Sequence, residues 1–313
     1  MTIERVLTAG IIALATVSAA EAASVGLGYT LGNNGQTLVI VGDLAAPGTL
    51  AGKTITNPDG KVLRLSELTV RPRTGELYGY SDADNTVYLV DPATGKARPK
   101  GTLPNATPVP AVGFDFNPTI DRARIVSVTD DNIVFNPETG GFTVATRLFY
   151  APGDANAGQD PSIFANAYTN SFAGITPPTT VTTVQYVIDS ELDTLATLAN
   201  NAGTMVTIGS FFLDGEAFDL GDIGGFDILS LAEGNNTALA LLTSTLGQAF
   251  YTFSLIPDAQ GRINLTSLGA AGGDFGLLRG LAVAPSAVPL PAGGLLLAGA
   301  LGGFALLRRR KIG

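Results

Sequence analysis

The chain of 313 residues contains no cysteine, no histidine and no tryptophan. Without cysteine there is no disulfide framework and no thiol nucleophile. Without histidine, a Ser-His-Asp triad and most zinc sites are excluded as well. The sequence also has no P-loop and no dinucleotide-binding glycine fingerprint between a strand and a helix. The chemistry left to this chain is that of carboxylates, hydroxyls, amides and arginines.

The N-terminal end has the pattern of a signal peptide. Arg5 precedes an apolar run over residues 6–17, and residues 20–22 read Ala-Glu-Ala, an A-x-A cleavage pattern. The run of 12 residues is too short to cross a membrane stably. We therefore expect residues 1–22 to be removed during secretion.

A longer apolar run closes the chain. Residues 288–307 carry no charge, and a basic cluster follows at once, made of Arg308, Arg309, Arg310 and Lys311. As a helix, this run would be about 30 Å long, which matches the hydrocarbon core of a bilayer. Positively charged flanks stay on the cytoplasmic side. The sequence therefore predicts one C-terminal transmembrane helix, which would hold the chain in a membrane at least transiently.

Positive charge is scarce between these two ends. Of 27 acidic and 18 basic residues, two acids and five bases lie in the end segments, which leaves the body with a net charge of about −12. Such a charge argues against nucleic acid and anionic lipid as partners. The body is long enough to bury its own core without disulfides.

The body, residues 23–285, repeats itself. Residues 77–95, "LYGYSDADNTVYLVDPATG", and residues 122–140, "RARIVSVTDDNIVFNPETG", end 45 residues apart. Both read as strand, polar turn and strand, followed by an Asp/Asn-Pro-x-Thr-Gly ending. In that ending the proline presets one turn residue, and the glycine supplies the positive φ that closes the loop. Alternation is of period two, and no long helical period appears.

Two looser copies, at residues 182–211 and 225–269, continue the pattern. Repeats of about 40 to 50 residues with about four strands each are typical of a β-propeller. A lone strand at residues 276–285 and a three-strand stretch at residues 36–65 would together complete one further unit. We expect an all-β, propeller-like domain of five blades, with one blade closed by both chain ends. The count would be six blades if residues 160–170 start a separate unit, and a β-sandwich is the alternative fold.

Several stretches carry a family resemblance. "GFDFNPTIDRARIVS", "NIVFNPETG", "ANAYTNS", "TTVQYVID" and the closing "RGLAV" resemble an uncharacterised exported bacterial family, domain of unknown function 4394. The resemblance covers nearly the whole body and implies no catalytic residue.

The tail resembles a second known pattern. The first five residues of the apolar run are Val288, Pro289, Leu290, Pro291 and Ala292. With the run and the basic cluster, they resemble the VPLPA variant of the PEP-CTERM sorting signals of Gram-negative bacteria. These signals are read by exosortase-type proteases and are associated with exopolysaccharide production. The resemblance implies that residues 286–313 sort the protein through the inner membrane to the cell surface or the medium.

Two acids are candidates for catalysis. Asp115 in "GFDFNP" and Asp227 in "GFDI" occupy like positions in their repeats, which we expect to be inner strands. If both pointed into a central channel, they would form the carboxylate pair that cleaves a glycosidic bond. The alternative is that each caps a turn or binds a backbone amide of a neighbouring strand.

Four further acids are candidates for calcium, the one cofactor that the sequence admits. They lie in two equivalent turns, "SDADN" and "TDDN", and are Asp82, Asp84, Asp130 and Asp131. Hard cations take clustered carboxylate oxygens. Neither turn has the spacing of a known calcium loop, however, and turns rich in Asp and Asn also form for backbone reasons alone.

Arginines and tyrosines in the repeats have two readings each. Arg71, Arg122 and Arg124 could pair with acids between blades or contact an anionic sugar, and we favour pairing. Tyr78, Tyr80 and Tyr88 would stack on sugars if exposed, but at strand positions we expect them to pack. Taken together, the sequence predicts a non-enzymatic, exported surface or matrix protein that binds or organises polysaccharide or surface proteins. A glycoside hydrolase or lyase is the alternative.

Overall fold

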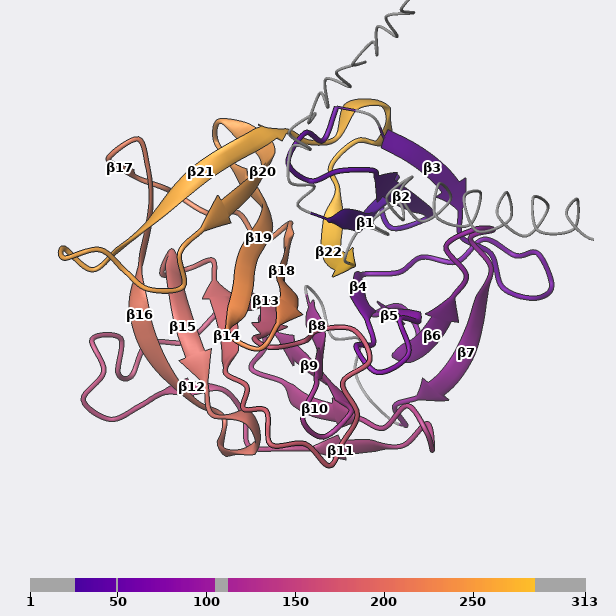
Figure 1. The fold of residues 1–313 in the computed structure, drawn as a ribbon, viewed down its shortest axis with the longest axis horizontal. Helices are drawn as coiled ribbons and strands as arrows, with labels where there is room; N and C mark the ends of the chain where they lie inside the picture. The colour runs from indigo at the N-terminus through magenta and orange to yellow at the C-terminus, as the bar shows by residue number, and fades with distance from the viewer. Residues whose placement is uncertain (1–25, 49, 105–111, 285–313) are drawn as a thin grey trace, which may run out of the picture.

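The computed structural model describes residues 26–48, 50–104 and 112–284 (Figure 1). Within these ranges the chain is built of β-strands, and its helical segments are two 3₁₀ turns, η1 (Asn200–Ala202) and η2 (Gly273–Phe275). The prediction of an all-β domain is confirmed. None of the helices in the described ranges is long and apolar enough to span a membrane. The expected signal peptide (1–22), sorting motif (288–292), apolar run (288–307) and basic cluster (308–311) lie outside the described residues.

Three antiparallel sheets have four strands each. The first is ordered β22 (Arg279–Ala284), β1 (Leu27–Gly32), β2 (Thr37–Val41) and β3 (Leu50–Thr54). The second is β4 (Glu67–Val70), β5 (Leu77–Ser81), β6 (Thr86–Val90) and β7 (Ala97–Thr102). The third is β8 (Val112–Asn117), β9 (Arg122–Ser127), β10 (Asn132–Phe135) and β11 (Phe142–Val144).

The remaining strands form one ten-stranded sheet, which contains two four-strand runs. The first run is β13 (Ile163–Tyr168), β14 (Gln185–Asp189), β15 (Thr194–Leu198) and β16 (Thr204–Leu213). The second is β18 (Gly225–Ala232), β19 (Asn235–Ser244), β20 (Gly247–Phe253) and β21 (Arg262–Ala270). Their outer strands β16 and β21 pair in parallel, which joins the two runs. Two short strands, β12 (Phe149–Tyr150) and β17 (Glu216–Ala217), also pair with β16.

Both ends of the domain meet in the first sheet, as the sequence predicts. Gly28 of β1 lies opposite Val283 of β22. The sequence assigned the other three strands of this sheet to residues 36–65. This was wrong in one respect, because β1 begins well before residue 36. Its sequence, "LGYTLG", has two glycines and little apolar alternation, so strand propensity alone does not single it out.

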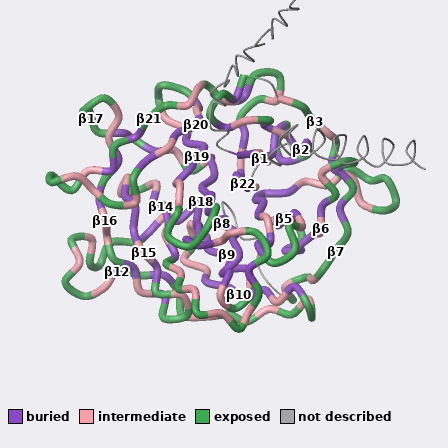
Figure 2. The backbone as a smooth tube through the Cα atoms, in the orientation of Figure 1, coloured by how far each residue is buried: buried purple, intermediate pink, exposed green. Residues whose placement is uncertain are grey.

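The first strands of the four-strand units lie in a closed circuit at the centre of the molecule (Figure 1). β22 contacts β4, β4 contacts β8, β8 contacts β13, β13 contacts β18, and β18 returns to β22. We call these the inner strands. β8 and β13 are buried along their whole length, whereas the outer strands β7 and β11 are mostly exposed (Figure 2). The fold is therefore propeller-like.

Apolar side chains hold neighbouring sheets face to face. Tyr78 of β5 meets Phe116 of β8 edge to face, with ring centroids 5.3 Å apart. Tyr80 lies in the same cluster, and both tyrosines are almost fully buried. Tyr88 is buried in the adjacent cluster. These tyrosines therefore pack in the core and are not available to stack on a sugar.

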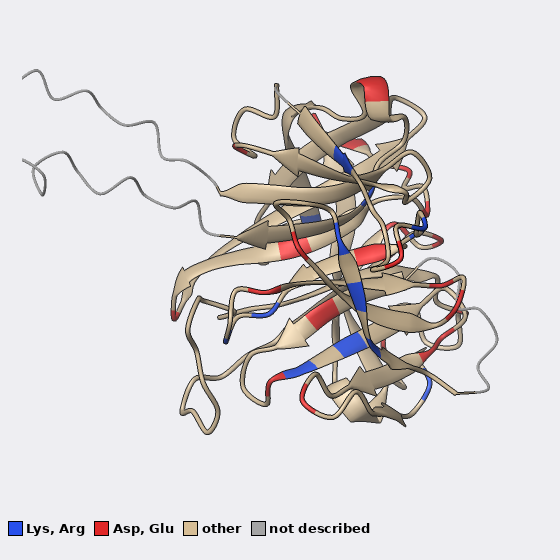
Figure 3. Cartoon of the chain, turned by 90° about the vertical axis from the view of Figure 1, so that its right-hand side faces the viewer, with Lys and Arg blue, Asp and Glu red and all other residues tan. Residues whose placement is uncertain are grey.

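Arginines link the sheets, but of the three arginines considered in the sequence only Arg71 pairs with acids among the described residues, as predicted. Arg122 donates to the backbone oxygens of Ile120 and Asp121, and the partners of Arg124 are a hydroxyl and two amide oxygens. Arg71, which follows β4, donates from Nε to Asp121 of the β8–β9 turn over 2.8 Å and also pairs with Glu138. Arg124 of β9 donates to the Tyr168 hydroxyl of β13 over 3.0 Å. Acidic and basic residues are interspersed along the strands in the edge-on view of Figure 3.

Candidate functional site

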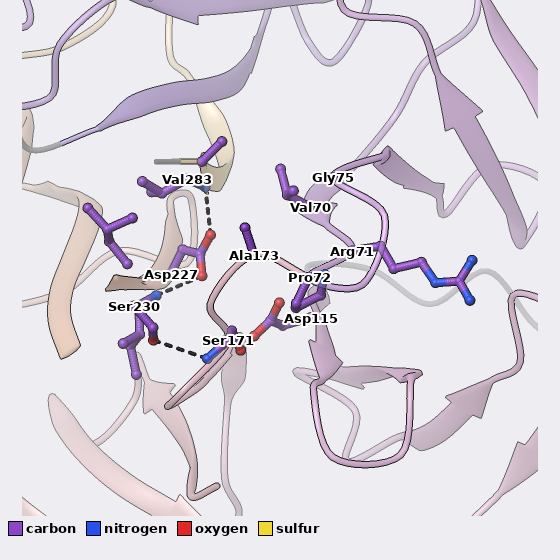
Figure 4. Close-up of a pocket in the computed structure, with 13 residues that line it drawn as sticks. Val70, Arg71, Pro72, Gly75, Asp115, Ser171, Ala173, Asp227, Ser230 and Val283 are labelled. Carbon is purple, nitrogen blue, oxygen red and sulfur yellow. Dashed lines mark hydrogen bonds between the residues drawn. The ribbon is translucent and has the colours of Figure 1, made fainter. Parts of the chain in front are cut away.

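Asp115 on β8 and Asp227 on β18 line the same pocket, close to the ring of inner strands (Figure 4). The pocket has a volume of about 250 Å³. Its other lining residues include the last residues of β4 and β22 and the segment after β13. The pocket therefore lies at the C-terminal ends of the inner strands.

Asp115 is tied to three inner strands. Its Oδ1 accepts hydrogen bonds from the Thr69 hydroxyl of β4 at 2.8 Å and from the Phe116 amide at 2.7 Å. Its Oδ2 accepts the amide of Tyr168 on β13 at 2.8 Å. One buried side chain thus connects β4, β8 and β13.

Asp227 repeats this arrangement on β18, which lies next to β13 on the side away from β8. Its Oδ1 accepts the Ile228 amide at 2.7 Å, and its Oδ2 accepts the amide of Val283 on β22 at 2.6 Å. Each aspartate therefore binds the amide of the residue that follows it and an amide of the next inner strand. This is the backbone-binding role that the sequence left open as the alternative to catalysis.

A third acid of the ring, Glu67 on β4, was not singled out by the sequence. Its Oε1 accepts the Leu68 amide at 3.0 Å and the amide of Leu281 on β22 at 2.9 Å. When residues 68–72, "LTVRP", are aligned with residues 114–118, "FDFNP", Thr69 corresponds to Asp115, so the repeat gives no signal for Glu67. An acid at the first position of a short apolar strand was the available clue.

Burial raises the pKa of all three acids. The pKa of Asp115 lies well above its usual range because the side chain is buried and because Asp227 adds a like charge. Burial raises the pKa of Asp227 to about 7, although its amide hydrogen bonds act in the opposite direction. Burial likewise raises the pKa of Glu67 well above its usual range. Each acid is therefore biased towards its protonated form.

The rest of the pocket is mainly apolar with two hydroxyls. Val70, Pro72, Ala173, Leu229 and Val283 form much of its wall. The Ser230 hydroxyl accepts the Ser171 amide at 3.1 Å and lies 2.7 Å from Asn236 Oδ1. Such a mixture suits a small ligand with apolar faces and polar edges.

Asn166 on β13 is the unusual member of the ring. It is 1% exposed, and neither its Oδ1 nor its Nδ2 has a hydrogen-bond partner in the described part of the chain. It packs against Gly113 of β8, where a Cβ atom would lie 2.7 Å from Asn166 Oδ1. The bare glycine lets β8 and β13 approach closely at this point.

The calcium candidates have local partners. Asp82 pairs with Arg64, and Asp130 pairs with Arg147 at 3.1 Å. The other two accept hydroxyl hydrogen bonds. Tyr88 donates to Asp84 at 2.7 Å, and Ser127 donates to Asp131 at 2.7 Å. Within the described ranges, no group of three or more acidic side chains is arranged to hold a metal ion.

The inner ring and its acid-to-amide bonds define a propeller-like, all-β domain with a small pocket at the C-terminal ends of the inner strands. Residues 38–275 match the family described as Domain of unknown function (DUF4394), and the chain belongs to this family. The resemblance noted in the sequence is confirmed for the domain. No curated protein matches the sequence significantly.

Solved structures that match part of this chain include an auxiliary nutrient binding protein from Bacteroides ovatus, with 15% identity and a TM-score of 0.36 over 68% of this chain. A catalytically inactive virginiamycin B lyase from Staphylococcus aureus with quinupristin has 12% identity and a TM-score of 0.41, over 77% of this chain and 69% of that one. The chain spans 55% of the length of the nutrient binding protein. At these identities and TM-scores, neither match carries a conclusion about this chain.

Proposed function

We propose that residues 23–285 form a five-bladed, non-enzymatic binding domain that attaches to or organises polysaccharide or other proteins at the cell surface. The observation that carries this proposal is the bonding of Asp115 and Asp227. Every one of their four carboxylate oxygens already accepts a hydrogen bond from the inner ring. Their evident task is to hold the strands in place, which leaves the pocket as a rigid recess for binding.

The chemistry of the pocket supports a ligand with the character of a sugar ring. Apolar residues such as Val70 and Leu229 would contact the faces of the ring. Ser171 and Ser230, with the edges of the aspartates, would meet its hydroxyls. Because the ring of strands is tied by buried hydrogen bonds, little ordering would be needed on binding, which favours affinity.

The route to the surface rests on the sequence. Residues 1–22 would be removed on secretion, and the tail would anchor the chain in the inner membrane of a Gram-negative bacterium until an exosortase-type protease reads residues 288–292. We expect the intact mass of protein recovered from the cell surface or medium to end near residues 288–292. A mass that extends to Gly313, found in the membrane fraction alone, would contradict release.

One observation favours a glycoside hydrolase or lyase as the second candidate. The pKa of Asp227 is raised to about 7 by burial, and Asp115 lies in the same pocket. An acid that is partly protonated at neutral pH, beside a second carboxyl group, is what a glycosidase needs as its proton donor.

Two measurements distinguish the binding domain from the enzyme. One is co-sedimentation of the purified chain with a panel of bacterial exopolysaccharides, and the other is an assay for new reducing ends and unsaturated products. We expect binding without turnover. Turnover that disappears in Asp115→Asn and Asp227→Asn, but persists in the exposed Asp91→Asn, would establish the enzyme instead. Absence of both binding and turnover across the panel would contradict a polysaccharide ligand.

A further inference from the structure

A second pocket lies at the opposite end of the inner ring. Its volume is about 260 Å³. Its lining includes residues at or near the starts of all the inner strands: Glu67, Val112, Phe164, Gly224 and Arg279. The pocket described above is lined by residues towards the ends of the same strands. The ring therefore carries a separate recess at each end.

Arg279, the first residue of β22, brings an unpaired positive charge into this second pocket. Its Nε is buried and has no hydrogen-bond partner among the residues described. None of the ion pairs found there includes Arg279. Burial, followed by the charge of Arg64, lowers the pKa of Arg279. A guanidinium held partly out of water without a carboxylate is costly, and a bound anion would offset that cost.

The surrounding charged groups do not cancel it. Arg64 is paired with Asp82. Glu67 uses Oε1 to accept two backbone amides, and burial raises its pKa well above the usual range, so its neutral form is favoured. Asp222 is exposed and belongs to none of the ion pairs in the described ranges. Arg279 is therefore the group that a ligand would neutralise.

The remaining lining indicates more than a bare anion. Phe164 and Val112 offer an apolar wall. The Ser66 hydroxyl accepts the Asp82 amide at 3.1 Å, and its hydrogen is used in no hydrogen bond among the described residues, so it is free for a ligand oxygen. The volume of about 260 Å³ lies just below the range for small-molecule pockets, which begins at about 300 Å³. This is room for one sugar-sized ring.

We propose that this pocket binds a small organic carboxylate of the size of one acidic sugar, with its carboxylate paired to the Arg279 guanidinium. The planar fork of an arginine matches a carboxylate in a bidentate pair. A single unpaired cation beside Asp222 and Asp82 suits one negative charge better than the two of a phosphate or sulfate. The excess of acids over the whole domain disfavours long polyanions and restricts the ligand to a small one. This inference concerns the other end of the ring and does not rest on the function proposed above.

The test is isothermal titration of the full-length chain, purified in mild detergent, with sodium glucuronate, glucose and sodium sulfate at equal ionic strength. We expect glucuronate to bind at least tenfold more tightly than glucose or sulfate. Arg279→Gln should abolish the preference for glucuronate over glucose. Arg279→Lys should weaken it, because an ammonium cannot form the bidentate pair. Arg147→Gln is the matched control, since that arginine is 73% exposed and pairs elsewhere.

Three outcomes would overturn the proposal. Equal binding of glucuronate and glucose, or no binding of either, would mean that the pocket recognises no carboxylate. Sulfate binding as tightly as glucuronate would mean an anion site of another kind. Unchanged glucuronate affinity in an Arg279→Gln protein that melts cooperatively would place the ligand elsewhere. If that variant fails to fold, the comparison of the three ligands on the unaltered chain still decides.

Discussion

Asp227 of β18 accepts the backbone amide of Val283 at 2.6 Å, and this bond fastens the last strand of the domain to the strand beside it in the ring. On its other side β22 pairs with β1, where Val283 lies opposite Gly28. One residue near the C-terminal end is thus held both by the first strand of the domain and by the inner ring. The ring is closed by side-chain bonds as well as by strand pairing.

Replacing this acceptor should weaken the whole domain. In Asp227→Asn the amide nitrogen cannot accept a second backbone amide, so either Val283 or Ile228 loses its partner. We expect a loss of about 2 kcal/mol in the free energy of unfolding, the usual cost of a buried, unsatisfied donor. Urea denaturation at pH 7 measures it. Asp91→Asn, in an exposed turn, should cost less than about 1 kcal/mol, and equal effects of the two would contradict the role of Asp227.

The stability of the domain should fall as pH rises above about 4. Burial raises the pKa of Asp227 from 3.8 to about 7 and that of Asp115 well above its usual range. Between pH 3.8 and about 7 the folded state binds more protons than the unfolded state. The stabilisation that these groups provide is therefore complete below pH 3.8 and is lost as the pH rises through their folded-state pKa values.

The size of this effect is about 1.4 kcal/mol per pH unit for each group within its window. Urea denaturation at pH 5, 6 and 7 measures the slope. Asp227→Asn removes one of the titrating groups and should reduce it. Stability that is constant or increases over this range in the unaltered chain would show that these acids titrate normally.

Arg71 should contribute more to the stability of the domain than its exposed partner, Glu138. Arg71 is buried and bound by Asp121, which is also buried, whereas Glu138 is 57% exposed. Among the described residues, Arg71→Ala leaves Asp121 with the half-exposed Arg73 as its one ion-pair partner, and we expect a loss of about 3 kcal/mol. Glu138→Gln should cost no more than about 1 kcal/mol. Thermal and urea unfolding of both variants measure the loss of stability. If both losses are small and similar, Arg71 and Asp121 do not form a buried ion pair between the sheets.

Gly113 should not tolerate a side chain. A Cβ atom there would lie 2.5 Å from the backbone nitrogen of Asn166 and 2.6 Å from the carbonyl carbon of Ala165. Gly113→Ala must push β8 and β13 apart, at an expected cost of more than about 2 kcal/mol. Gly42→Ala is the control, because a Cβ atom there meets nothing within 4 Å. A Gly113→Ala protein as stable as Gly42→Ala would contradict the close approach of the two strands.

Calcium should leave the melting temperature unchanged. The carboxylate of Asp84 already accepts the Tyr88 hydroxyl of β6, and that of Asp131 accepts the Thr129 hydroxyl of its own turn. Scanning calorimetry with calcium and with a chelator should therefore give coincident curves. A higher melting temperature in calcium, lost on Asp131→Asn, would restore the turns as a binding site.

The hairpins of the repeat could be predicted because their chemistry is local. Asp91 binds the amide of Ala93 and the hydroxyl of Thr94, and Gly95 has a φ of 75°. Gly140 ends the second copy with a φ of 73°. All the groups that set these turns lie within five residues, so their order along the chain is sufficient to recognise them. Asp115 and Asp227 could be singled out for a different reason, because they occupy like positions in their repeats.

The role of those acids and the second pocket could not be predicted in this way. Glu67 accepts an amide from Leu281, 214 residues away, and no local pattern indicates that meeting. Arg279 and Arg64 line the same pocket, and no local pattern indicates this either. Strand periodicity and turn chemistry are properties of neighbouring residues, so the sequence by itself determined the all-β class, the repeat and the family. Which carboxylates bind amides, and which arginine is left without a partner, depends on burial and on distances across the closed ring, and only the tertiary structure decided these.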